Sequence, residues 1–331
     1  MALQNKKIKK NKNYSKLLVI FFLCIVFIFP TPSYKGAKHG LLMWFDTVLP
    51  TLLPFIIISN LIIGMEITRI LSKFLHPFLR LLFKVSPHGS YPILIGFLSG
   101  IPVGAKATAD LVERGDISKE EGQYLLSFCN NPSPMFIMSF IAISQLKQPS
   151  IRFHLLIINL LSAILGSFLC FRMTSLFKHK EKRVNTLSIL ELTNSTANKD
   201  TSIKFDFGVL DKAIMDGFEV ITKVGGYIIL FSIPAEIISS LIRGKNFIKI
   251  IFLGFLEITT GINYIANTGL DLNIKIILIA TITAFGGLSG MAQTKSVISS
   301  TQLSIVSYFK NKIVHMLIAF ALATLYVILY H

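Results

Sequence analysis

Apolar runs of different lengths alternate along the chain with short polar or charged segments. About eight such runs can be counted, and a helix needs roughly 20 apolar residues to cross about 30 Å of hydrocarbon. Residues 44–65 reach that length, whereas the run over residues 91–104 ends early, at a charged segment. We therefore predict an all-α, polytopic helical membrane protein in which some helices are broken or re-entrant.

Proline and charge mark the boundaries of the runs in the first part of the chain. Residues 17–29 follow a lysine-rich tail and stop at Pro30, a pattern shared by an uncleaved first helix, a signal anchor and a signal peptide; we favour the uncleaved helix. Pro50 and Pro54 are expected to kink or split the span over residues 44–65. Two further runs, expected to be ordinary spans, cover residues 124–146 and 153–177.

Residues 69–84 predict a helix that lies along the membrane surface instead of crossing it. Leu and Phe alternate there with basic side chains at spacings of three and four, which is the period of an amphipathic helix. The basic side chains are Arg69, Lys73, His76, Arg80 and Lys84. We expect this helix to contact anionic lipid.

The second part of the chain begins with an amphipathic stretch over residues 211–224. We expect spans over residues 225–242, 247–266 and 313–330, and a broken run over residues 274–291.

A polar segment rich in Asn, Ser, Thr and Lys separates two apolar halves. The resulting division is a basic tail with the first apolar segment (1–39), a first membrane half (40–177), a polar linker (178–204) and a second membrane half (205–331). Because Lys and Arg are enriched in cytoplasmic loops, we place the tail, the surface helix and the linker on the cytoplasmic side.

The two halves show a weak internal similarity. "FDTVLPTLLPFIIIS" at residues 45–59 aligns without gaps with "FEVITKVGGYIILFS" at residues 218–232, and "GFLSG" at 96–100 matches "GGLSG" at 286–290. The two motifs lie further apart in the second half than in the first, which predicts an insertion between them in the second half. Secondary transporters are commonly built from such repeats, often inverted, with the substrate site where interrupted helices of both halves meet.

Composition supports the membrane assignment. Of 331 residues, 52% are apolar and 15% charged, and the mean hydropathy is +0.64, beyond the range of ordinary soluble domains. The 33 Lys and Arg against 17 Asp and Glu give a formal net charge of +16. These charges lie between apolar runs and in the tail, without a nucleic-acid-binding motif, so we expect no nucleic acid as a partner.

Sequence motifs of enzymes and metal sites are absent. There is no zinc spacing, Walker loop or nucleophile elbow, and "GGLSG" is not G-x-S-x-G. The three cysteines and seven histidines are dispersed. We predict that the protein is not an enzyme and has no catalytic residue, metal site or cofactor.

Each G-x-L-S-G element interrupts an apolar run, and a lysine follows it. Backbone groups freed by such a break must face protein or a water-filled cavity, and freed amides with a serine hydroxyl can hold an anion. The substrate-binding residues predicted at these two breaks are Ser99, Gly100, Lys106, Ser289, Gly290 and Lys295. The alternative is close helix packing at Gly and Ser, with each lysine extending to the membrane surface.

Two further polar features lie in apolar surroundings. "FCNNPSPMF" places Asn130, Asn131 and Ser133 at a break that can read carboxylate or carbonyl oxygens, or that is a plain helix cap. Glu257, in "GFLEITTGIN", is a candidate proton carrier or ion-pair partner for a lysine, because an acid inside a membrane is costly.

Four segments carry a resemblance to a known family. They are "LPTLLPFIIISNLI", "GFLSGIPVGAKATADLVERGDISKEEGQYLLSFCNNPSPMF", "GFLEITTGI" and the late "GGLSG". The chain resembles the YlbJ-type sporulation integral membrane proteins, also called stage V sporulation protein V, in the wider nucleoside-recognition or Gate group. The similarity covers most of the chain after residue 40, and the block over residues 96–136 is its most specific part.

The resemblance implies a protein of the outer forespore membrane of a spore-forming bacterium that moves dipicolinic acid towards the developing spore. Dipicolinate is a small planar dianion, which would need cationic and amide donors. The alternatives are a nucleoside-type or other small-metabolite transporter, and a membrane scaffold for sporulation proteins that moves nothing. A homo-oligomer and a sporulation protein partner are both compatible with the sequence.

Overall fold

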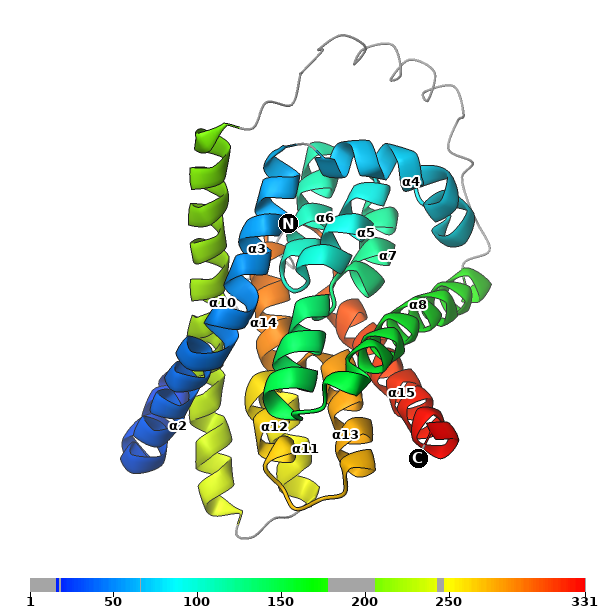
Figure 1. The fold of residues 1–331 in the computed structure, drawn as a ribbon. Helices are drawn as coiled ribbons and strands as arrows, with labels where there is room; N and C mark the ends of the chain where they lie inside the picture. Colours follow the sequence, from blue (N-terminus) through cyan, green and yellow to red (C-terminus); the bar gives the residue numbers. More distant parts are fainter. Residues whose placement is uncertain (1–15, 18, 66, 178–205, 243–246, 331) are drawn as a thin grey trace.

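The computed structural model describes residues 1–331 except for residues 1–15, 18, 66, 178–205, 243–246 and 331 (Figure 1). The predicted linker over residues 178–204 therefore lies outside the described residues. Within the described ranges the chain forms helices and no strand, which confirms the all-α class. Five of the described helices are long and apolar enough to cross a membrane, and Val19–Ile28 forms a shorter apolar helix.

The first long helix runs from Pro30 to Gly64. It consists of α2 (Pro30–Leu42), the π-helical turn η1 (Met43–Val48) and α3 (Leu49–Gly64). Pro30 begins this helix, because a proline in the first turn removes an N–H that has no helical partner. Pro54 lies inside α3 without splitting it. The span predicted over residues 44–65 is thus the second part of a longer helix.

α4 (Ile67–Phe83) lies across one end of the long helices (Figure 1). Leu79 and Phe83 are buried against the protein, whereas Phe74 and Leu81 on another face are exposed. The helix predicted in this region is confirmed. An exposed apolar face beside basic side chains is the pattern of a helix that rests on a membrane surface.

A helical hairpin follows α4. It consists of α5 (Ser90–Ser99) and α6 (Val103–Arg114). The chain turns at Gly100, whose φ of 77° is a left-handed conformation that glycine adopts readily. The two helices then pack closely, since a Cβ at Gly104 would lie 2.9 Å from the Cα of Gly96. This hairpin confirms the re-entrant segment predicted over residues 91–104.

An interrupted helix and a long helix complete the first half. They are α7 (Lys119–Cys129), the π-helix η2 (Phe136–Gln145), the short 3-10 turn η3 (Pro149–Ile151) and α8 (Arg152–Phe177). The ordinary span predicted over residues 124–146 is wrong, because the helix stops before Asn130. Pro132 and Pro134 in this segment provide no backbone N–H, so the helical hydrogen bonding cannot continue through it.

Two helices of the second half are longer than predicted. α10 (Phe207–Leu241) is one helix of 35 residues, so the amphipathic stretch over residues 211–224 and the span over residues 225–242 are not separate elements. α15 (Ile305–Tyr330) begins before the predicted start of the last span at residue 313. In both cases charged side chains lower the local hydropathy without ending the helix.

The remaining elements of the second half are interrupted. They are α11 (Phe247–Leu256), α12 (Ile258–Ala266), α13 (Leu272–Phe285) and α14 (Gly287–Val297). α11 and α12 form a second hairpin that turns at Glu257, and a Cβ at Gly261 would lie 2.5 Å from the Cα of Gly254. The single span predicted over residues 247–266 is therefore wrong. The break predicted inside residues 274–291 is confirmed, at Gly286.

The order of elements is the same in both halves. Each has a long helix, a hairpin, an interrupted helix and a second long helix: α3, α5–α6, α7–η2 and α8 in the first, and α10, α11–α12, α13–α14 and α15 in the second. In Figure 1 the first hairpin occupies the upper part of the molecule and the second the lower part. The two hairpins therefore enter from opposite ends, as in an inverted repeat.

This order corrects the predicted alignment of the halves. "GFLSG" at 96–100 ends the first helix of a hairpin, whereas "GGLSG" at 286–290 lies at the break of an interrupted helix, so the two are not counterparts. The counterpart of the turn at Gly100 is the turn at Glu257. The additional segment is α4, which lies in the first half. The insertion predicted in the second half is therefore wrong.

Small residues allow the first long helix to pack against α10. A Cβ at Gly36 would lie 2.6 Å from the carbonyl oxygen of Ser232, and a Cβ at Gly40 would lie 2.8 Å from the Oγ of that serine. The indole N–H of Trp44 donates to the carbonyl oxygen of Ile221 at 2.9 Å. Close approach through glycine and serine is common between membrane helices.

We expect Gly104→Ala to destabilise the packing of the first hairpin against α7, because the added Cβ would lie 2.1 Å from the carbonyl oxygen of Cys129. Overpacking of this kind costs about 1–3 kcal/mol, so the midpoint of thermal unfolding in detergent should fall. Gly226→Ala on α10 is the control, since nothing lies within 4 Å of its added Cβ. Equal midpoints for the two variants would contradict the predicted contact.

Candidate functional site

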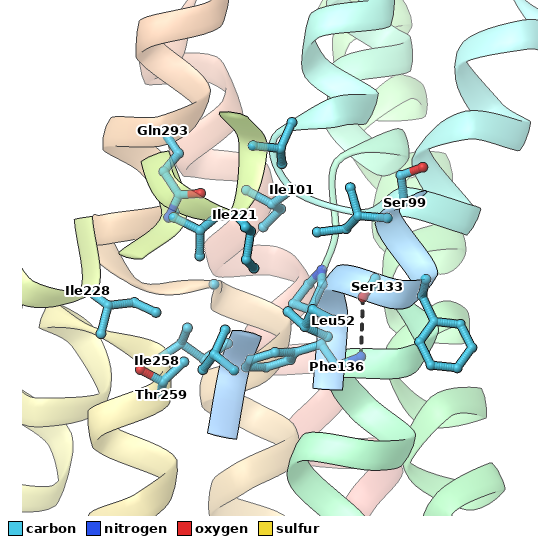
Figure 2. Close-up of a pocket in the computed structure, with 18 of the residues that line it drawn as sticks. Leu52, Ser99, Ile101, Ser133, Phe136, Ile221, Ile228, Ile258, Thr259 and Gln293 are labelled. Atoms are coloured by element: carbon cyan, nitrogen blue, oxygen red, sulfur yellow. Dashed lines mark hydrogen bonds between the residues drawn. The ribbon is translucent and has the colours of Figure 1, made fainter. Parts of the chain in front are cut away.

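A cavity lies where the interrupted helices of both halves meet (Figure 2). The first hairpin contributes Ser99 and Ile101, the break between α7 and η2 contributes Ser133, the second hairpin contributes Glu257, and α14 contributes Gly290. Four breaks that are distant in sequence therefore border one space.

The walls of the cavity are mainly apolar. α3 provides Leu52, η2 provides Phe136, and α10 provides Ile221 and Ile228 (Figure 2). The cavity has a volume of about 80 Å³, whereas a single water molecule needs about 10–15 Å³. A small molecule or several waters can thus be accommodated, and a mostly apolar wall with few polar groups is typical of small-molecule sites.

Two serines of the first half lie at the cavity. The Oγ of Ser99 is buried and has no hydrogen-bond partner among the described residues. The Oγ of Ser133 accepts a hydrogen bond from the backbone N–H of Phe136 at 3.2 Å, at the helical turn that leads into η2 (dashed in Figure 2). Gly100 brings the two segments together, because a Cβ there would lie 2.6 Å from the backbone nitrogen of Ser133. Ser99 is therefore available to a bound molecule.

Glu257 lines the cavity and is 1% exposed. One carboxylate oxygen accepts hydrogen bonds from the backbone N–H of Thr260 at 2.7 Å and from the hydroxyl of Thr259. The side chain thus caps α12, where a negative charge is favourable beside the helix N-terminus. Within the described ranges no lysine forms an ion pair with Glu257, and the role of this residue as a proton carrier stays a prediction.

The N-terminal part of α14 forms another side of the cavity. Gly290 and Gln293 line it, whereas Ser289 is buried behind them and accepts a hydrogen bond from the side-chain amide of Gln293 at 3.4 Å. No side chain caps the start of α14 at Gly287. Its first backbone amides therefore carry uncompensated partial positive charge.

Asn130 joins the two halves. Its Nδ2 donates to the Oγ1 of Thr294 at 2.7 Å and to the hydroxyl oxygen of Tyr308 at 2.9 Å, and its Oδ1 accepts from the N–H of Ala105 at 3.3 Å. The hydroxyl of Tyr308 donates to the backbone carbonyl of Asn130 at 3.0 Å. Asn130 is fully buried and does not line the cavity, so its observed contacts are structural.

Asn131 contacts a buried lysine. The Nζ of Lys312 on α15 donates to the Oδ1 of Asn131 at 2.7 Å and lies 5.5 Å from the centre of the Tyr308 ring. The backbone carbonyl of Asn131 accepts from the N–H of Ile101 at 2.9 Å, and Ile101 lines the cavity. A buried lysine thus lies behind the wall of the cavity.

Lys106 and Lys295, the two lysines predicted to bind substrate, are exposed and do not line the cavity. Their exposure matches the alternative in which each lysine extends to the surroundings of the protein. The structure therefore brings Ser99, Ser133 and Gly290 together with Glu257 and leaves these two lysines outside.

Lys312 and His315 were not predicted as site residues. The last span was expected to begin after Lys312, and His315 was taken as one of seven dispersed histidines. A signal was present nonetheless. Tyr308, Lys312 and His315 follow one another at spacings of four and three, which places all three on one face of α15. Polar residues that share a face within an apolar helix indicate a buried polar cluster.

Comparison with known proteins agrees with this architecture. A family model described as "Gate: Nucleoside recognition" matches residues 45–178. The sporulation integral membrane protein YlbJ of Bacillus subtilis (strain 168) is 30% identical over 320 residues, which cover 88% of this chain and 78% of the relative. No solved structure matches the chain. The chain is an integral membrane protein, and it belongs to the family of the sporulation integral membrane protein YlbJ.

Proposed function

We propose that the protein is a transporter that moves a small anionic metabolite across a membrane without altering it chemically. The supporting observation is that four helix breaks, two from each half, border one cavity. Lipid cannot satisfy the backbone groups freed by such breaks, so the breaks have to face protein or a water-filled space. Secondary transporters place their substrate sites at meeting points of this kind.

Dipicolinate is the proposed substrate, and the outer forespore membrane is the proposed location. Both proposals follow from the family, whose relative in Bacillus subtilis is named a sporulation integral membrane protein. The cavity is chemically compatible, because Phe136 and Ile221 can cover the faces of a planar ring. The hydroxyl of Ser99 and the amides at the start of α14 can donate to carboxylate oxygens.

A nucleoside is the second candidate substrate, because the family model that matches residues 45–178 is described as nucleoside recognition. A nucleoside is uncharged, so its binding would need no cation beside the cavity. The two candidates can therefore be separated by direct competition.

Purified protein in liposomes is expected to take up labelled dipicolinate in a saturable manner. Unlabelled dipicolinate should compete for uptake, and uridine should not, because the proposed site binds a dianion. Protein-free liposomes provide the background. Uptake of labelled uridine that dipicolinate does not inhibit would favour the second candidate. If folded protein takes up neither compound, the transporter proposal is wrong and the scaffold alternative gains support.

Filling the cavity should block transport. A Cβ at Gly290 would lie 3.7 Å from the Cδ1 of Ile101, which is ordinary van der Waals contact, so Gly290→Ala should retain uptake. Gly290→Leu adds three further carbons that occupy the space of the substrate, and we expect about tenfold slower uptake with an unchanged unfolding midpoint. Wild-type uptake by a folded Gly290→Leu variant would remove the cavity from the transport path.

Glu257 is proposed to couple transport to a proton gradient, since a buried carboxyl at a cavity can bind and release a proton. Glu257→Gln keeps an oxygen that can accept from the N–H of Thr260 and removes the titratable group. We expect an imposed pH gradient to accelerate uptake by the wild type but not by this variant. Equal acceleration of both proteins would exclude Glu257 as the coupling residue.

A further inference from the structure

We propose that Lys312 is the cationic ligand for the transported anion, and that a carboxylate of the substrate replaces the Oδ1 of Asn131 on its ammonium group. This inference rests on the proposed function and extends it to a residue behind the cavity lining. Three observations carry it: the burial of Lys312, the unsatisfied ring of His315, and the position of Asn131 between Lys312 and the cavity.

Lys312 is 0% exposed and is the single buried Lys or Arg among the described residues. Its Nζ has three donors, yet the structure gives it one hydrogen bond, to Asn131 at 2.7 Å, and the face of the Tyr308 ring. No carboxylate lies within 4.0 Å of it in the described part of the chain. Burying an ammonium group is energetically costly unless an anion compensates it. Lys312 therefore has unused capacity for an anionic partner.

His315 lies one helical turn after Lys312, on the same face of α15. Both of its ring nitrogens are buried without a hydrogen-bond partner among the described residues. Gly166 on α8 makes room for the ring, since a Cβ there would lie 2.3 Å from the Cδ2 of His315. An unsatisfied buried ring is costly, so His315 offers a second polar group to the same ligand.

Asn131 connects this pair to the cavity. The two residues that follow it, Pro132 and Ser133, line the cavity, and its backbone carbonyl accepts a hydrogen bond from the N–H of Ile101, another lining residue. Its side chain contacts Lys312. A rotation of the Asn131 side chain would therefore release the ammonium group for a ligand at the break.

The charges around the cavity also require such a cation. Glu257 is the acidic residue in the lining, and no Lys or Arg lines the cavity within the described ranges. A dianion in this space would meet a like charge without compensation. Lys312 is the described cation that can offset it, because Lys106 and Lys295 are exposed elsewhere.

The first test compares the affinity of detergent-solubilised variants for labelled dipicolinate and for its uncharged diamide, pyridine-2,6-dicarboxamide. We expect Lys312→Gln to weaken dipicolinate binding about tenfold or more, equivalent to about 1.4 kcal/mol, and to leave diamide binding within about threefold. Lys310→Gln is the matched control, because Lys310 is exposed on the same helix. It should bind both compounds as the wild type does.

Asn131→Asp provides a second test that keeps the lysine. The new carboxylate would sit on the ammonium group of Lys312 and compete with the substrate, although the variant loses the amide hydrogen bond to the carbonyl of Phe128. We expect dipicolinate binding to fall about tenfold while the unfolding midpoint stays within a few degrees. This variant decides the question if Lys312→Gln does not fold.

The outcomes separate the two proposals. If the wild type binds dipicolinate and both variants bind it equally well, the role of Lys312 is overturned and the proposed function stands. If Lys312→Gln weakens dipicolinate and diamide equally, Lys312 is structural and the inference is again overturned. If the folded wild type binds neither compound, the proposed substrate is wrong and the inference about Lys312 falls with it.

Discussion

Backbone hydrogen bonding inside the membrane is the constraint on which the rest of this structure depends. Four helix breaks meet at one cavity, and lipid could offer no partner to the N–H and C=O groups at those breaks. At three of these breaks a side chain accepts a hydrogen bond from the first turn of the next helix, whereas the start of α14 has no side-chain cap. Asn130 accepts from Ala105, Glu257 accepts from Thr260, and Ser133 accepts from Phe136. The cavity lies between these ends, so the same arrangement that stabilises the breaks also creates the site.

The hydrogen bonds that Asn130 makes between the two halves follow from the same constraint. Asn130 lies at a break of the first half, but its side chain bonds to Thr294 on α14 and Tyr308 on α15. The two halves therefore share one hydrogen-bond network at their centre. Because the network is buried, any movement that separates the halves has to break bonds that water cannot immediately replace.

Features with a local cause could be predicted from the sequence. The turn at Gly100 and the surface helix α4 were predicted because glycine, proline and a regular spacing of basic residues act over a few positions. Glu257 was recognised because an isolated acid in an apolar run is unusual. For all three, neighbouring residues carry enough information.

Features that depend on contacts between distant segments could not be predicted. A charged residue lowers local hydropathy whether it faces solvent or another helix, so Lys312 was placed outside the last span although α15 buries it against Asn131. The predicted alignment of the two halves was wrong for a related reason. Short motifs of Gly, Leu and Ser recur at helix breaks of different kinds, and only the order of whole elements shows which break is the counterpart of which.

The presence of α4 in one half alone makes the two hairpins mechanically unequal. α4 packs on α5 and presents Phe74 and Leu81 outwards, so moving the first hairpin along the membrane normal would carry this apolar surface out of lipid, at about 25 cal/mol per Å² exposed to water. The second hairpin carries no such helix among the described residues. The two related halves are therefore unequal in one respect, because any displacement of the first hairpin has to carry α4 with it and the second hairpin has no such load.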